Sequence, residues 1–175
     1  MKQNSKLTLS AMMTALACAF MLLSFFPYLT YAIPAIAGLF VMVVVIEINY
    51  KWAFLSYIAS ALVVAFFPEP ESKMLYIFFF GFYPIIKAVV ERFRKPVLEW
   101  ILKYLVFNVS LVVVYFAFSK VINFSLEEFG AFGKYGAIIL WALGNIVFVV
   151  YDIAVSRMAM MYISVLHPKL KKFLK

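Results

Sequence analysis

The stretch LFVMVVVI, residues 39–46, is apolar at every position and lies inside a longer apolar run from Ile33 to Ile48. Strands of a membrane β-barrel alternate apolar and polar residues, because one side faces lipid and the other faces the lumen. A run without this alternation instead indicates a helix with apolar surroundings on all sides. The segment therefore favours an all-α membrane protein.

Five further apolar runs flank this stretch, and polar or charged residues separate them. Hydrophobic residues make up 67% of the 175 residues and charged residues 14%, which is far from the composition of a soluble domain. A bilayer core about 30 Å thick takes roughly 20 helical residues to cross. We therefore expect a single domain, a polytopic bundle of six transmembrane helices that uses the whole of residues 1–175. The predicted spans are 7–26, 33–48, 52–67, 74–90, 97–118 and 135–155.

The first predicted helix follows Lys2 and Lys6, as the apolar part of a signal peptide would. Its apolar run is about 20 residues long, which is longer than the apolar part of a signal peptide. Its Ala-x-Ala triplets lie inside the run, between Ala15 and Ala19, rather than after it, where a cleavage site belongs. We therefore expect the first helix to be retained.

Basic residues are concentrated in alternate connections between the predicted helices. Of the 16 Lys and Arg residues, only Lys73, Lys120 and Lys134 fall on the side opposite to the two termini. Cytoplasmic loops carry most of the Lys and Arg of a membrane protein. We therefore expect both termini to be cytoplasmic. The outer face is nearly neutral, which disfavours a strongly anionic ligand.

Sequence motifs for catalysis are missing from the chain. His167 is the only histidine and Asp152 the only aspartate, so neither a histidine-rich zinc site nor a pair of catalytic aspartates can form. No Gly-x-Ser-x-Gly or Gly-x-x-x-x-Gly-Lys sequence is present. We expect a solvated His167, no enzymatic activity, no metal and no cofactor. The surface outside the membrane is too small for a nucleic-acid site.

Ionisable residues of the predicted helices lie near the cytoplasmic ends. Lys87 and Glu91 are four residues apart, as are Glu99 and Lys103, so each pair can meet on one helical face. We expect these pairs to have a structural or coupling role rather than to carry ions, because ion pathways place ionisable groups deep in the bundle. Pro84 should bend the fourth predicted helix.

Neutral polar and aromatic residues occur in the outer and middle parts of the last three predicted helices and beside the first outer connection. Aromatic faces can bury the rings of a small organic ligand, while a few amides and hydroxyls fix its orientation. Tyr and Trp also form the interfacial belt of membrane proteins, and Asn can bridge two helices. Both interpretations remain open. The residues that we predict to contact a ligand are Tyr31, Tyr76, Tyr83, Tyr115, Trp141 and Asn145.

The first predicted helix has one smooth face, because Ala11, Ala15 and Ala19 are spaced four residues apart. In lipid, small residues at this spacing allow two helix backbones to approach closely. The face could pack against another helix of the same chain, or it could bind a partner protein.

The chain length, the six helices, the cytoplasmic termini and this alanine ladder together resemble the S components of energy-coupling-factor (ECF) vitamin transporters. The resemblance implies the substrate-binding subunit of an ABC importer in the plasma membrane of a prokaryote. A transmembrane T component would dock on Ala11, Ala15 and Ala19, and two cytoplasmic ATPases would drive transport. A vitamin or similar micronutrient would enter from outside and be held by the outer halves of helices four to six and the first outer loop. Reorientation of the S component in the membrane would then release it inward.

A second class of protein fits the same size and topology. The cell-shape protein MreD is also a six-helix membrane protein, and a scaffold similar to it would hold partners of envelope synthesis instead of transporting a ligand. A small molecule retained by the purified protein would favour transport, whereas an empty bundle that copurifies with wall-synthesis proteins would favour the scaffold. A membrane enzyme that acts on lipid is a third possibility, and it lacks a catalytic pair.

Overall fold

The computed structural model describes residues 2–26, 29–66, 68–121 and 136–169, and these ranges are helical without any strand. Within them, the side chains of residues 118–121, 136–137 and 140 are not described. Most of the connection between the last two predicted helices, including Lys134, lies outside the described residues. The expected all-α fold class is confirmed.

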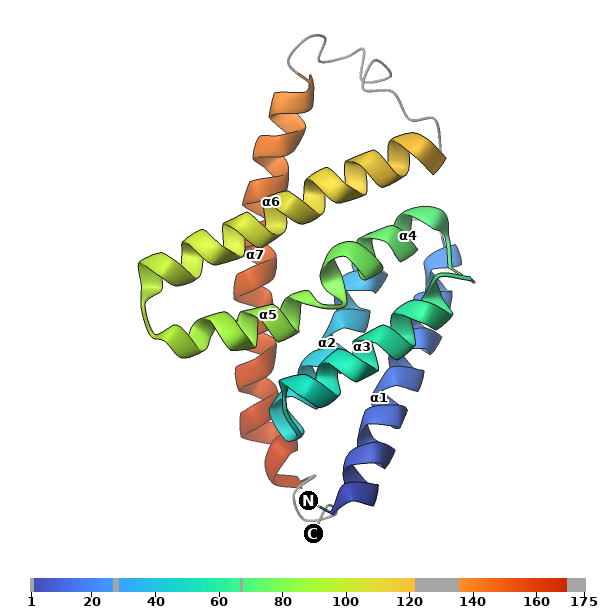
Figure 1. The fold of residues 1–175 in the computed structure, drawn as a ribbon, viewed down its shortest axis with the longest axis vertical. Coiled ribbons are helices and arrows are strands. Elements are labelled where there is room, and N and C mark those ends of the chain that lie inside the picture. The colour runs from blue at the N-terminus through green and yellow to red at the C-terminus, as the bar shows by residue number, and fades with distance from the viewer. Residues whose placement is uncertain (1, 27–28, 67, 122–135, 170–175) are drawn as a thin grey trace.

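Helices follow one another along the described chain, and each of the six predicted apolar runs contributes at least one of them (Figure 1). Short 3-10 or π-helical segments, labelled η, extend or interrupt several of them. The elements are α1 (Gln3–Leu22), η1 (Leu23–Phe25), α2 (Ala32–Glu47), α3 (Tyr50–Val64), α4 (Pro70–Leu75), η2 (Tyr76–Phe80), α5 (Tyr83–Val90), η3 (Glu91–Phe93), α6 (Pro96–Val121), α7 (Gly136–Met161) and η6 (Tyr162–Leu166).

Four helical segments of the described chain are long and apolar enough to cross a membrane. They are Gln3–Phe25, Pro70–Phe93, Pro96–Ala117 and Trp141–Lys169. α2 and α3 are also apolar but have only 16 and 15 residues. At 1.5 Å per residue these two helices are roughly 24 and 22 Å long, which is less than the thickness of about 30 Å of a bilayer core. The structure therefore shows four candidate spans and two shorter apolar helices.

α2 lies at the centre of the packing and contacts α1, α3, α5 and α7. One core cluster joins its Ala37 to Ala17 and Met21 of α1. A second cluster joins its Val44 to Ala53 of α3 and to α5. The small and β-branched residues of this helix therefore serve packing inside the bundle.

The fourth apolar run is interrupted just before Pro84, as predicted for a proline in a helix. Pro84 has no N–H to donate to the carbonyl of Phe80. The chain instead forms the π-helical segment η2, in which the Gly81 N–H donates to the Tyr76 carbonyl at 2.8 Å. The Tyr57 hydroxyl of α3 donates to the Ile77 carbonyl at 2.6 Å and holds the segment in place.

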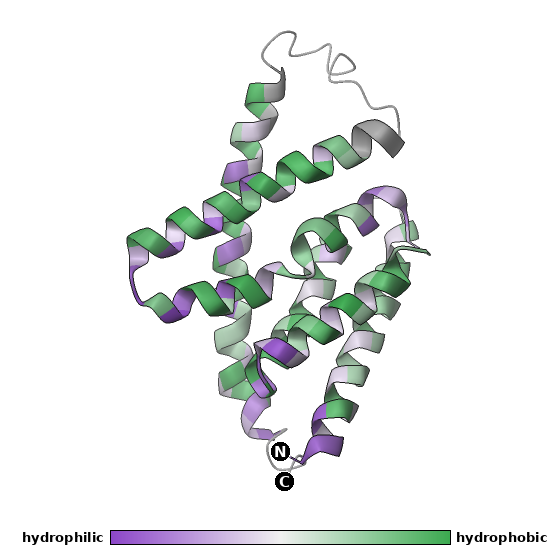
Figure 2. Cartoon of the chain, in the orientation of Figure 1, coloured by the Kyte–Doolittle hydropathy of each residue, from purple (hydrophilic) through white to green (hydrophobic). Residues whose placement is uncertain are grey.

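The outward faces of the long helices are apolar. Figure 2 shows hydrophobic residues along most of their length and hydrophilic residues mainly at helix ends and turns. Large apolar side chains such as Phe116 on α6 and Ile146 and Val150 on α7 are exposed. Exposed apolar surface of this extent indicates contact with an apolar environment and is compatible with a membrane protein. The start of α1 and the end of η6 lie at the same end of the molecule (Figure 1).

Candidate functional site

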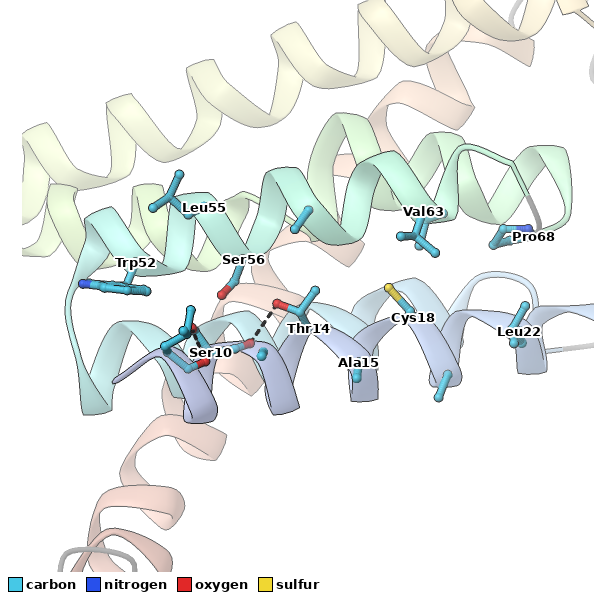
Figure 3. A pocket seen from close by; sticks show the side chains of 15 residues that line it. Ser10, Thr14, Ala15, Cys18, Leu22, Trp52, Leu55, Ser56, Val63 and Pro68 are labelled. Atoms are coloured by element: carbon cyan, nitrogen blue, oxygen red, sulfur yellow. Dashed lines mark hydrogen bonds between the residues drawn. The ribbon is translucent and has the colours of Figure 1, made fainter. Parts of the chain in front are cut away.

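A groove with a volume of about 830 Å³ runs between α1 and α3 on the outside of the bundle (Figure 3). The two helices lie side by side, and side chains from both line the space between them. Larger apolar residues lie at its ends, with Trp52 at one end and Leu22 at the other. Leu7, Leu55, Val63, Val64 and Pro68 also line the groove. The remaining lining residues are small, and they are Ser10, Ala11, Thr14, Ala15, Cys18, Ala19, Ser56 and Ala59.

The alanine ladder lies on the surface of the bundle rather than in its core. Ala11, Ala15 and Ala19 are all exposed, whereas Ala17 and Met21 on the same helix are fully buried. Ala17 and Met21 therefore form the contact through which α1 packs against α2. The ladder is therefore exposed in this structure, and its role in binding a partner stays a prediction.

Two hydroxyls of the groove are bonded within α1. The Ser10 hydroxyl donates to the Leu7 carbonyl at 3.0 Å, and the Thr14 hydroxyl donates to the Ser10 carbonyl at 2.8 Å (Figure 3). A hydroxyl that is bonded to its own helix has little capacity left for hydrogen bonds to a neighbour. The groove is therefore a smooth and mainly apolar surface, suited to close packing with another membrane helix.

None of the six residues that were predicted to contact a ligand lines this groove, and in the described part of the chain they lie in several places. Tyr31 is exposed beside the start of α2, and its hydroxyl donates to Glu71 at 3.1 Å. Partial burial and then the Glu71 carboxylate raise the pKa of the Tyr31 phenol, so it remains a donor. On α7, Trp141 donates to the side-chain oxygen of Asn108 at 2.7 Å, and the Asn145 oxygen accepts from the Asn108 amide at 3.1 Å. Tyr31 thus bonds near the start of α2, whereas Trp141 and Asn145 bond to α6.

The three remaining tyrosines occupy other places. Tyr76 is fully buried, and its hydroxyl lies 2.7 Å from the Ser60 hydroxyl of α3. Tyr83 is also fully buried and donates to Asp152 of α7 at 2.6 Å. Tyr115 is exposed on α6. Tyr76 and Tyr83 therefore join helices to one another in this structure. A ligand-binding role for the six residues stays a prediction.

Four charged side chains from α5, η3, α6 and α7 form a closed network, of which the sequence patterns predicted only the Lys87–Glu91 pair. The Lys87 ammonium lies 2.5 Å from Asp152 Oδ1 and 2.7 Å from Glu91 Oε1. The Lys103 ammonium lies 2.8 Å from the same Glu91 oxygen and 3.2 Å from Asp152 Oδ2. Two cations and two anions make the network neutral.

The network is largely removed from solvent. The side chains of Lys87, Lys103 and Asp152 are each 5% exposed, and that of Glu91 is 42% exposed. Burial of one unpaired charge costs several kcal/mol, so the four groups depend on one another. The expected Lys87–Glu91 pair is present, but Lys103 bonds to Glu91 and Asp152 of other elements rather than to Glu99. Charges of balanced sign on separate apolar helices are the signal that could have revealed this site.

His167 also differs from the expectation of a solvated side chain. Its ring Nδ1 lies 2.8 Å from Glu47 Oε1, and the Tyr162 hydroxyl donates to the same oxygen at 2.9 Å. The Glu47 side chain is only 4% exposed. This contact joins the end of α2 to the chain that follows α7.

Among the described residues, no group of three or more His, Cys, Asp or Glu side chains could hold a metal ion. No family model, no curated protein and no solved structure matches the chain. A functional interpretation therefore depends on the groove, the charge network and the packing of the helices themselves.

Proposed function

We propose that the chain is the substrate-binding subunit of an ECF-type ABC importer in the plasma membrane of a prokaryote. It captures a vitamin or similar small organic micronutrient from outside and associates with a transmembrane T component and two cytoplasmic ATPases. The observation that carries the proposal is the open groove between α1 and α3 with Ala11, Ala15 and Ala19 on its wall. No ATP-binding motif occurs in the sequence, so ATP-driven transport by this chain would need partners that hydrolyse ATP.

The groove supports the docking of a membrane helix because of its size and its chemistry. Its volume of about 830 Å³ provides room for several large apolar side chains of a partner. The Ser10 and Thr14 hydroxyls are bonded within α1, so a partner helix does not have to satisfy these two groups. In lipid, packing of large side chains against small ones is the main source of helix association. The proposed T component supplies that helix.

The proposal includes six spans with both termini cytoplasmic. α2 and α3 are short, but both pack against longer apolar helices. A short helix in such a position is accommodated by local thinning of the bilayer or by snorkelling of flanking residues, each at a modest cost. The excess of Lys and Arg on the side of the termini supports the orientation.

We expect the substitution Ala15→Leu to weaken association with the T component without preventing folding. Leucine at this exposed position adds bulk to the groove, and overpacking of a close contact costs about 1–3 kcal/mol. That cost corresponds to roughly 5-fold to 150-fold weaker association. The measurement is the amount of T component and ATPases that copurifies with the tagged chain from native membranes.

The matched control is Ala154→Leu, which places the same bulk on an exposed part of α7 outside the groove. This variant should retain its partners. Equal copurification by the two variants would contradict docking in the groove. Recovery of envelope-synthesis proteins in place of the T component would instead support a scaffold similar to MreD.

A further inference from the structure

A second cavity, with a volume of about 220 Å³, lies between η2, α6 and α7. None of the six residues predicted to contact a ligand lines it. Aromatic side chains make up much of its wall, and they come from all three elements. They are Phe79, Phe80, Phe107, Phe148 and Tyr151.

The aromatic wall is held in place by ring contacts. Phe107 of α6 and Phe148 of α7 are stacked, with their centroids 4.6 Å apart and an interplanar angle of 14°. Phe79 meets Phe107 edge to face at 5.3 Å, and Phe80 meets Tyr151 in the same way at 4.8 Å. Rings that support one another lose little further freedom when a ligand binds. Their faces and edges are suited to contact with another planar ring.

The chemistry of the lining excludes a charged ligand. None of the described residues that line the cavity has a charged side chain. Asp152, which follows Tyr151 in the chain, already bonds to Lys87, Lys103 and Tyr83. An ion in the cavity would therefore be desolvated without a counter-ion, which is strongly unfavourable.

Two hydroxyl residues belong to the same wall. Ser110 lines the cavity and is 5% exposed. Tyr151 contributes to the wall, but its buried hydroxyl lies beside α2, where a Cβ atom on Gly38 would be 3.5 Å from it. The accessible surface of the wall is therefore almost entirely apolar, and it is suited to the apolar face of a ring.

The size of the cavity limits the ligand to a small molecule. Drug-sized ligands occupy pockets of roughly 300–1,000 Å³, whereas an apolar cavity of about 150 Å³ can bind benzene. Gly144 of α7 contributes to the space, since a Cβ atom there would already touch Leu111 of α6 at 3.4 Å.

We propose that the cavity between η2, α6 and α7 binds a small, uncharged, planar ring compound of one ring or two fused rings. That this compound is the transported substrate rests on the proposed function, whereas the binding site itself does not. The cavity thus narrows the substrate of the importer to the class of neutral aromatic or heteroaromatic micronutrients.

The test uses indole as a neutral planar probe and indole-3-carboxylate as its anionic counterpart. The purified full-length protein in detergent is titrated with each probe, and binding is measured by calorimetry. We expect indole to bind with a dissociation constant below about 1 mM and indole-3-carboxylate to bind at least tenfold more weakly. Absence of indole binding, or equal binding of both probes, would overturn the proposal.

A pair of variants separates binding in the cavity from partition into detergent. Gly144→Leu fills the cavity and should weaken indole binding at least tenfold. Ala142→Leu adds the same bulk to an exposed position of α7 that does not line the cavity, and it should bind like the original chain. If Gly144→Leu does not fold, Val147→Phe, a change at an exposed lining residue, provides the same test. Equal indole binding by the filled and control variants would reject the site.

The binding test and the copurification test fail independently. If no T component copurifies but indole still binds, the proposed importer function is rejected and the proposed binding site is retained. Copurification of the T component without indole binding would retain the importer and reject this ligand class.

Discussion

Replacement of Lys87 with methionine is expected to lower the free energy of unfolding by about 3–5 kcal/mol, the usual cost of removing one member of a buried ion pair. The substitution leaves two carboxylates, Asp152 and Glu91, to share the single ammonium of Lys103. The Asp152 side chain is only 5% exposed, so water cannot replace the lost partner. The measurement is equilibrium unfolding of the purified protein in mixed micelles with increasing SDS.

Two further variants distinguish the charge imbalance from the loss of one side chain. Lys51→Met removes an exposed lysine at the start of α3 and should change the stability by less than about 0.5 kcal/mol. The double variant Lys87→Met, Asp152→Leu restores neutrality and should be more stable than Lys87→Met alone, because replacement of a whole buried pair by apolar residues is often tolerated. A Lys87→Met protein as stable as the original would show that the network does not hold α5, α6 and α7 together.

Substitution of Gly38 by alanine is expected to destabilise the protein by about 1–3 kcal/mol, because it overpacks a tight backbone contact. A Cβ atom at Gly38 of α2 would overlap the carbonyl oxygen of Phe80 in η2. That oxygen belongs to the backbone, so it cannot move aside as the end of a flexible side chain can. The measurement is the same SDS unfolding experiment, in which the free energy of unfolding of Gly38→Ala should be lower than that of the original protein.

Gly144→Ala is the matched control for this contact. A Cβ atom there would meet only side chains, Leu111 at 3.4 Å and Phe107 at 3.7 Å. Alanine is also favoured over glycine inside a helix by roughly 1 kcal/mol. Gly144→Ala should therefore be as stable as the original protein or more stable. A Gly38→Ala protein that matches Gly144→Ala in stability would contradict the close approach of α2 and η2.

Local sequence patterns predicted much of the fold. Uninterrupted apolar runs indicate helices regardless of tertiary context, and Pro84 cannot continue the hydrogen bonding of a helix. The predicted number of six spans is not settled by the structure, because α2 and α3 are shorter than a bilayer core is thick.

The candidate sites were less predictable, since they depend on contacts between distant segments. Lys103 and Asp152 are 49 residues apart in the chain, and no spacing rule relates them. The tyrosines were recognised as polar and aromatic, but the sequence did not reveal that Tyr76 and Tyr83 bond to neighbouring helices. With 20 phenylalanines in the chain, the few that line the cavity carry no distinguishing pattern. The alanine ladder was recognised from its spacing, and only the fold could show that it is exposed.

The most direct test of the central claim is photo-crosslinking from position 15 in native membranes. A photoreactive amino acid replaces Ala15, and the adduct is identified by mass spectrometry. We predict an adduct with a polytopic T component that copurifies with two ATPases, and no such adduct from the same probe at position 154. An adduct from position 15 with an envelope-synthesis protein or with a second copy of the chain, without a T component, would contradict the claim.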